Sequence, residues 1–231
     1  MKLLSPIKSA HSRTTARRRA TALALSTVVA GTAAAALATP ASAVTPAAAT
    51  VLGGFPASYS DGTSTFVPCV DGSLHCGGTT AADVTAPDGE FFYNLVEGQV
   101  PVKTGGFVKV VIGLEGAFDP DTGQPTVFHR VRFVGRDLVP GKYTIVHPYG
   151  TAEFTTDGRG RGRSSVDTDC LTAGCGPTTF LTGALVGNYK DNGGVEGSIT
   201  GGINGVNSVT VKQGANQVGF LNKFTVQAKV G

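Results

Sequence analysis

Apolar and polar residues alternate with a period of two through much of the chain after residue 106, and this pattern restricts the fold more than any other feature of the sequence. Val108, Ile112 and Leu114, for example, fall on one side of an extended chain, with Lys109 and Glu115 on the other. Successive side chains of a β-strand point to opposite faces, so the alternation is typical of a half-buried strand. It predicts strands near residues 107–118, 126–134, 142–147, 151–156, 208–212 and 223–230.

Glycine supplies the turns between these strands. The chain has 33 glycines in 231 residues, about twice the usual share, and they lack the three-residue period of collagen. No convincing amphipathic helix follows residue 43, and residues 91–93 and 179–181 are weaker strand candidates. Many short strands with frequent turns predict an all-β fold. We expect a single-domain antiparallel β-sandwich with glycine-rich turns across residues 51–231, or alternatively a β-barrel.

The first 43 residues have the composition of a secretory signal peptide. Six basic and no acidic residues lie in this leader, an uncharged Ala-rich stretch runs from Thr21 to Thr39, and Ala41-Ser42-Ala43 forms a small-x-small cleavage site. We therefore expect cleavage after Ala43 and a secreted protein, extracellular or associated with the cell surface. The low-complexity residues 44–50 are expected to form a disordered N-terminal segment.

Removal of the leader changes the sign of the net charge. The whole chain has 19 Lys+Arg and 16 Asp+Glu, and six of the basic residues lie in residues 1–43, so the net charge goes from +3 to −3. A weakly acidic chain lacks the basic surface that nucleic acids require and the polybasic patch that binds anionic membranes. No apolar run near 20 residues follows the leader, so no membrane span is expected.

Four cysteines remain after the leader, an even number that in an exported chain indicates disulfides. Short spacing favours the pairs Cys69 with Cys76 and Cys170 with Cys175 among the three possible connectivities. A four-cysteine zinc site is the alternative, but the spacing of the first pair is wider than zinc knuckles use.

Two histidines lie in or beside predicted strands. His129 shares a strand face with Val127 and Val131, which favours a packed core histidine over a ligand. His147 precedes Pro148, which holds it extended at a strand end, where it could stabilise a turn or face a ligand. His147 and the neighbouring Tyr149 are therefore candidate binding residues, and no sequence motif of a zinc protease or a serine hydrolase occurs.

Carboxylates form two sparse clusters. Asp119 and Asp121 have the alternating spacing of calcium ligands, yet the third acidic position and the distal bidentate Glu are missing. A plain hydrogen-bonded turn explains them at least as well, so calcium is only a weak candidate and no other cofactor is expected. Asp167 and Asp169 would point to one face of an extended chain, either as a metal pair or as solvated charges.

Arg159, Arg161 and Arg163 alternate with glycines and form the one stripe of positive charge. On an extended backbone the three guanidinium groups would share a face and could bind an anionic polymer through bidentate contacts. Equally, the charges could keep a glycine-rich loop soluble.

The sequence resembles an uncharacterised family of secreted, β-rich bacterial proteins of the kind that actinobacterial genomes encode. The resemblance covers nearly the whole chain after the leader and implies a β-rich extracellular protein, with no catalytic residues to transfer. Its matching residues are Gly54-Phe55-Pro56, Phe91-Phe92-Tyr93, the segments 113–118 and 127–133 and, most specifically, Val139-Pro140-Gly141-Lys142-Tyr143-Thr144-Ile145-Val146-His147-Pro148-Tyr149-Gly150.

Together these features favour a secreted, non-catalytic binding or surface-associated protein, whose partner is a cell-wall or other extracellular polymer or another protein. A small secreted hydrolase that uses His147 or a carboxylate pair is one alternative. A structural surface protein that self-assembles through exposed strand edges is another.

Overall fold

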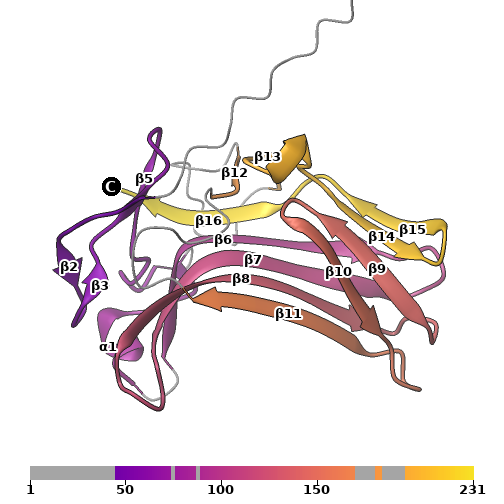
Figure 1. Cartoon of the computed structure of the whole chain (residues 1–231), viewed down its shortest axis with the longest axis horizontal. Helices are drawn as coiled ribbons and strands as arrows, with labels where there is room; N and C mark the ends of the chain where they lie inside the picture. Colours follow the sequence, from indigo (N-terminus) through magenta and orange to yellow (C-terminus); the bar gives the residue numbers. More distant parts are fainter. Residues whose placement is uncertain (1–44, 74–75, 87–88, 170–179, 184–195) are drawn as a thin grey trace, which may run out of the picture. The chain divides into compact units, whose positions relative to one another are not determined.

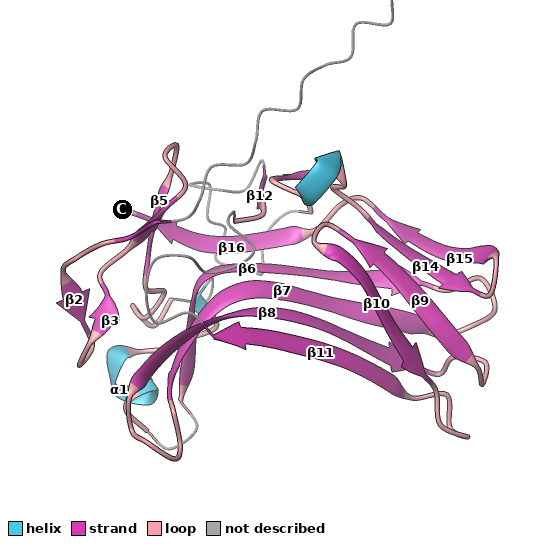
Figure 2. Cartoon of the chain, in the orientation of Figure 1, coloured by secondary structure: helices cyan, strands magenta, loops and turns pink. Residues whose placement is uncertain are grey.

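The computed structural model describes residues 45–73, 76–86, 89–169, 180–183 and 196–231 of the chain (Figure 1). These residues belong to one compact unit that spans residues 38–231. Strands dominate it (Figure 2), and the strand pairs among the described residues are antiparallel. The expected all-β antiparallel fold is therefore confirmed.

Eight strands form a large sheet and four form a smaller one. The large sheet has the order β1 (Thr45–Pro46), β4 (Tyr59–Ser60), β5 (Thr65–Val67), β16 (Thr225–Val230), β6 (Glu90–Pro101), β7 (Phe107–Phe118), β8 (Pro125–Arg136) and β11 (Gly162–Asp169). The smaller sheet has the order β10 (Gly150–Thr155), β9 (Lys142–His147), β14 (Val209–Gln213) and β15 (Asn216–Leu221).

Short elements complete the described fold. Two further sheets have two strands each, and the helices are a single-turn α-helix and a 3-10 helix. These elements are β2 (Thr50–Val51) with β3 (Phe55–Pro56), β12 (Thr182–Gly183) with β13 (Ile199–Thr200), α1 (Ala81–Val84) and η2 (Ile203–Gly205).

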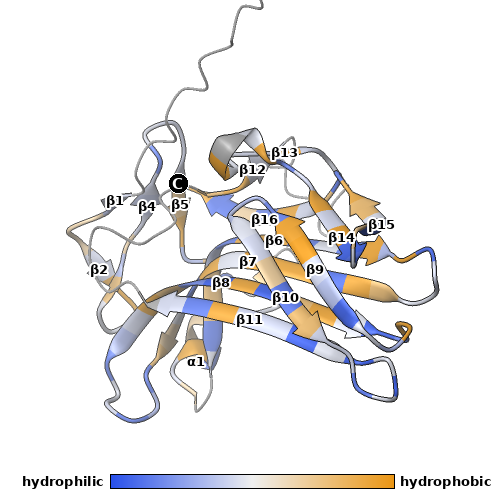
Figure 3. Ribbon diagram, turned by 45° about the vertical axis from the view of Figure 1, so that its right-hand side comes forward, coloured by the Kyte–Doolittle hydropathy of each residue, from blue (hydrophilic) through white to orange (hydrophobic). Residues whose placement is uncertain are grey.

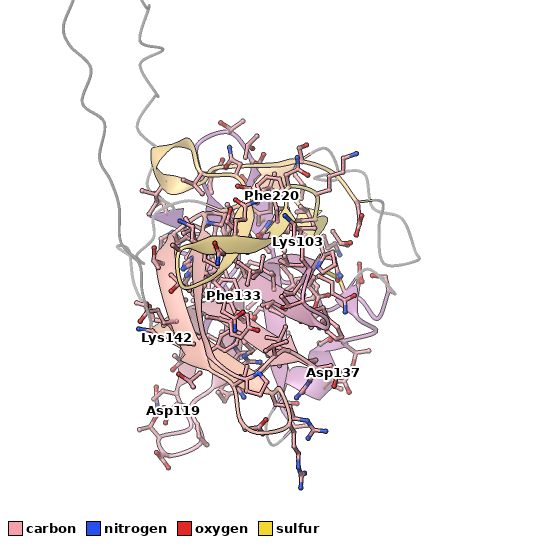
Figure 4. The ribbon with its side chains drawn as sticks, turned by 90° about the vertical axis from the view of Figure 1, so that its right-hand side faces the viewer. Lys103, Asp119, Phe133, Asp137, Lys142 and Phe220 are labelled. Atoms are coloured by element: carbon pink, nitrogen blue, oxygen red, sulfur yellow. A yellow bond between two sulfur atoms is a disulfide. The ribbon has the colours of Figure 1, made fainter. Side chains whose placement is uncertain are left out.

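The two larger sheets face each other across a shared apolar core. Val96 and Phe133 of the large sheet and Ile145 and Val211 of the smaller one belong to the same buried cluster. Figure 4 shows Phe133 inside the ribbon. Figure 3 shows that hydrophobic and hydrophilic residues alternate along the strands. This period of two gives each sheet one apolar face, and burial of these faces against each other stabilises the sandwich.

The six strands predicted from alternation are present as β7, β8, β9, β10, β14 and β16. Residues 91–93, a weaker candidate, lie within the long strand β6. The disordered segment predicted for residues 44–50 is wrong for its described part, because Thr45–Pro46 pairs with β4 and Thr50 pairs with Pro56. Phe180 and Leu181 are buried but lie outside any strand.

Candidate functional site

The face of the large sheet that points away from the smaller sheet carries most of its charged residues, and we call it the outer face. On β8, Val131 and Phe133 belong to the shared core, so the alternate residues of this strand point outwards. The strand register places the outward residues of β7 and β11 beside them. The charged residues at the centre of the outer face are Glu90, Glu115, Arg130, Arg132 and Asp167.

Arg130 lies at the centre of this face and binds three carboxylates. Its Nη1 lies 2.8 Å from Oε2 of Glu90 and 2.5 Å from Oε2 of Glu115, and its Nε lies 3.2 Å from Oδ1 of Asp167. The guanidinium carbon also lies 4.8 Å from the centre of the Phe128 ring. Only 9% of the Arg130 side chain is exposed, so its charge is compensated by protein groups rather than by water.

Strand register explains why these groups meet. Asp167 on β11 lies directly opposite Arg130 on β8, and the β7 residue opposite Arg130 is Gly113. A side chain at Gly113 would have its Cβ 3.1 Å from Oε1 of Glu115, so the glycine leaves room for this carboxylate to reach the guanidinium. The cluster is thus assembled by cross-strand neighbours that are far apart in sequence.

Burial raises the pKa of Glu115 to about 7, because loss of solvent outweighs the attraction of Arg130. Desolvation also works against the charge of Arg130, but hydrogen bonds to Glu90 and Asp167 and the charge of Glu115 raise the Arg130 pKa above its usual value. Arg130 therefore stays charged, while Glu115 can take up a proton near neutral pH.

A second group of charges lies at the β8 end that contains Arg136. Arg136, Arg161 and Arg163 line one shallow pocket of about 530 Å³ together with the carboxylate of Asp157, and we call it the arginine pocket. Among the residues that the structure describes, none of the three makes an ion pair. Burial and repulsion by Arg130 and Arg163 lower the pKa of the adjacent Arg132, which indicates crowded positive charge.

The expected straight stripe of Arg159, Arg161 and Arg163 is wrong, because the backbone turns before β11 begins. Oδ1 of Asp157 accepts the N–H groups of Arg159 at 2.8 Å and Arg161 at 2.9 Å, and Gly160 has a φ of +70°. Of the three arginines in this run, Arg161 and Arg163 line the arginine pocket and Arg159 does not. The third arginine of the pocket is Arg136, which is distant in sequence, instead of the expected Arg159.

A third feature is a cavity of about 660 Å³ at the opposite end of β8, which we call the acidic cavity. Its charged lining consists of Glu90, Asp119, Asp167 and Arg130. Its apolar lining includes Phe118, Phe128, Pro120, Ala117 and Ala86. The capping box of α1 holds the turn before Ala86: the Thr80 hydroxyl accepts the N–H of Asp83, and the Asp83 carboxylate accepts the N–H of Thr80.

Asp119 and Asp121, the weak calcium candidate, lie in the turn between β7 and β8, and Figure 4 shows Asp119 at the periphery. Oδ1 of Asp119 accepts the N–H groups of Asp121 at 3.1 Å and Thr122 at 2.7 Å, and the Thr122 hydroxyl at 2.8 Å. This is the hydrogen-bonded turn that the sequence offered as the alternative. Over the described ranges, no group of three or more His, Cys, Asp or Glu residues could hold a metal.

His129 and His147 are both packed within the fold, each only 6% exposed. His129 lies edge-on to Tyr149, with ring centres 4.7 Å apart, and His147 lies 5.0 Å from Phe133. Nδ1 of His147 accepts the N–H of Tyr149 at 3.3 Å, so His147 stabilises the β9–β10 turn as an acceptor. The candidate binding residues His147 and Tyr149 line neither the arginine pocket nor the acidic cavity.

We expect these two histidines to destabilise the fold in acid. Burial lowers the pKa of each to about 4, below the ordinary value of 6.5, so below pH 6.5 the unfolded chain binds more protons than the native one. Stability that is complete above pH 6.5 should fall by about 2–3 kcal/mol per histidine as the pH approaches 4. Urea unfolding at pH 7, 5.5 and 4 measures this loss.

His147→Asn is the matched variant, since an amide oxygen can accept the Tyr149 N–H but does not titrate over this range. It should show a smaller loss of stability than the natural protein between pH 6.5 and 4. An identical pH dependence in both proteins would contradict the role given to His147.

Cys69 and Cys76 form the predicted disulfide, with their Cα atoms 5.1 Å apart. They pack against Phe92 and Leu95 of β6, and Phe92 and Leu95 also line a hollow that contains Glu115 and Arg132 of the outer face. The disulfide thus holds a loop over this face. Cys170 and Cys175, the second predicted pair, lie outside the described residues.

Sequence reasoning missed three of the groups that make up the outer face. Glu90, Glu115 and Arg136 belong to different strands and were not singled out. Alternation could have placed Arg130, Arg132 and Arg136 on one face of the same strand, but it carries no signal for their partners. Asp167 was noted only with Asp169, not with Arg130.

No protein-family model, no curated protein and no solved structure matches this chain. Within the described part of the chain, no helix combines the length and the apolar composition needed to cross a membrane. The geometry of the outer face is therefore the main support for a function.

Proposed function

We propose that the protein is a secreted, non-catalytic binding protein that holds an anionic extracellular polymer in the arginine pocket. The observation that carries this proposal is the convergence of Arg136, Arg161 and Arg163 on one pocket whose described lining has one carboxylate, that of Asp157. Guanidinium groups form paired hydrogen bonds with phosphate, sulfate or carboxylate groups. Three of them on one open surface suit a repeated anionic ligand.

Secretion is supported by two features. The leader has the basic, apolar and small-residue regions of a signal peptide in the right order. The disulfide between Cys69 and Cys76 fits an oxidising compartment. Both support a partner outside the cell.

The state of the acid and base groups favours binding over hydrolysis. Glu90 and Glu115 both bind Arg130. His147 is buried, and one ring nitrogen is bound to the backbone of the β9–β10 turn. A hydrolase needs an acid, base or nucleophile that can contact a substrate, and Glu115 and His147 are instead buried and bound inside the protein.

The test is retention of the natural protein without its leader on beads that carry dextran sulfate, compared with the variant Arg136→Gln/Arg161→Gln/Arg163→Gln. Without its leader the chain has a net charge of −3, so retention by a polyanion requires a local positive surface. We expect affinity to fall about tenfold or more in the triple variant at 0.1 M salt. The difference should vanish near 1 M salt, where the Debye length is about 3 Å instead of about 10 Å.

Arg159→Gln is the matched control, because Arg159 belongs to the same loop but does not line the pocket. It should retain most of the affinity. Equal losses in Arg159→Gln and Arg161→Gln, or equal retention of the natural protein and the triple variant at every salt concentration, would reject the arginine pocket as the binding site.

A further inference from the structure

The acidic cavity differs in chemistry from the arginine pocket on the same strand. Among the residues that the structure describes, its lining contains the carboxylates of Glu90, Asp119 and Asp167 and the guanidinium of Arg130. The lining therefore has a net charge of two negative units when all four groups are ionised. Hydrogen bonds from Thr122 lower the pKa of Asp119, which keeps this carboxylate charged. Carboxylates that line a recess focus a negative potential into it and attract cations.

The walls of this cavity suit an apolar body attached to the cation. Phe118 and Phe128 contribute aromatic rings, and Pro120 and Ala117 add aliphatic surface. The guanidinium of Arg130 lies over one face of the Phe128 ring, so an ammonium group would use the other aromatic surface of the cavity, that of Phe118. Aromatic walls with nearby carboxylates are a common setting for ammonium groups.

We infer that the acidic cavity binds an ammonium group attached to an apolar or sugar-like body, and that the polymer held by the arginine pocket carries such amines together with its anionic groups. The first half stands on the cavity alone. The second half rests on the function proposed above and narrows the ligand to a zwitterionic polymer.

The distance between the two sites sets the minimum length of a polymer chain that binds both. Arg136 lines the arginine pocket and Phe128 lines the acidic cavity, and both belong to β8. Eight residues of a strand span roughly 26 Å, at about 3.3 Å per residue. Between the two sites lies Arg132, whose Nε donates to the Ser165 hydroxyl. One polymer chain of a few repeating units could reach both sites along β8.

The first experiment titrates the natural protein without its leader with phenethylammonium, followed by NMR. Phenethylammonium should bind, and its neutral N-acetyl derivative should bind at least about fivefold more weakly because it lacks the charge. Asp119→Asn removes one lining charge but keeps an oxygen that can accept the turn's N–H groups, and it should weaken binding about fivefold.

Asp121→Asn is the matched control, since it makes the same charge change in the same turn at a residue that does not line the cavity. It should change the affinity less than twofold. Equal affinity for the ammonium probe and its neutral derivative, or equal effects of Asp119→Asn and Asp121→Asn, would overturn the cavity as an ammonium site.

A second experiment separates this inference from the proposed function. A sulfated glycan with free amines is compared with the same glycan after N-acetylation, and the free-amine form should bind at least about fivefold more tightly. Arg136→Gln/Arg161→Gln/Arg163→Gln should weaken both glycans and leave phenethylammonium binding unchanged. If the ammonium probe binds but neither glycan depends on the arginines, the cavity stands and the proposed function fails. If both glycans depend on the arginines but bind equally, the zwitterionic ligand is rejected and the proposed function stands.

Discussion

Replacement of Arg130 by methionine is expected to lower the free energy of unfolding by about 3–5 kcal/mol. Arg130 is the cation that three carboxylates share: Nη1 and Nη2 bind Glu90, Nε and Nη2 bind Asp167, and Nη1 also binds the buried Glu115. Without the guanidinium these acidic groups face one another across β6, β7 and β11. Glu115 has only 8% of its side chain exposed, so water cannot replace the lost partner. Urea unfolding at pH 8 measures the change, since Glu115 in the natural protein is mostly ionised there.

A second substitution should recover much of this loss. Glu115→Leu in the Arg130→Met background removes the buried carboxylate and leaves Glu90 and Asp167, which are partly exposed and can be hydrated. Lys109→Met is the control on the same face: the Lys109–Glu97 pair is exposed, and its loss should cost less than about 1 kcal/mol. Equal costs for Arg130→Met and Lys109→Met would show that burial of the Arg130 cluster has been misjudged.

Gly160→Ala is expected to cost at least about 3 kcal/mol, a large effect for the addition of one methyl group. The φ of +70° at Gly160 is one that L-residues rarely adopt. A Cβ there would also lie 2.7 Å from the backbone nitrogen of Leu138 and overlap its carbonyl oxygen. The Leu138 N–H donates to the Gly160 carbonyl at 3.0 Å, so the loop cannot move away without losing this bond.

Gly158→Ala provides the comparison within the same loop. An added Cβ at Gly158 meets nothing within 4 Å, and its φ lies outside the strained range, so the expected change is within about 0.5 kcal/mol. The measurement is thermal unfolding of both variants, in which Gly160→Ala should have the lower midpoint temperature. Similar midpoints would contradict the assigned geometry of the loop. Since Gly160 lies between Arg159 and Arg161, we also expect Gly160→Ala to weaken retention on dextran sulfate.

Strands with regular alternation were the part of the fold that the sequence could predict. β7 and β8 have apolar residues at every second position because one of their faces is in the core. β6 is just as long but was only weakly indicated, because the pairing register shifts between Phe92 and Asn94 and moves later side chains to the other face. β11 was missed because most of its residues are polar or charged, and its one large apolar residue, Val166, is 57% exposed.

The site was predictable only where its residues are neighbours in sequence. Arg161 and Arg163 attracted notice as members of a charged run, but the turn stabilised by Asp157 separates Arg159 from them. Arg136 joins them because Gly135 on β8 pairs with Gly162 on β11. Pairing between distant strands brings together the residues of the arginine pocket and the partners of Arg130. A single sequence shows no visible pattern for such pairing.

The position of β16 has a consequence for how the chain reaches its native state. In the large sheet β16 lies between β5 and β6, and its residues pair with Phe66 and Val67 on one side and with Asn94 to Glu97 on the other. The strands β1, β4 and β5 therefore join the rest of this sheet by hydrogen bonds only after residues 225–230 are in place. Such non-local closure slows folding, because chain entropy is lost before the contacts form. The large sheet of a nascent chain would thus remain incomplete until β16 is available for pairing.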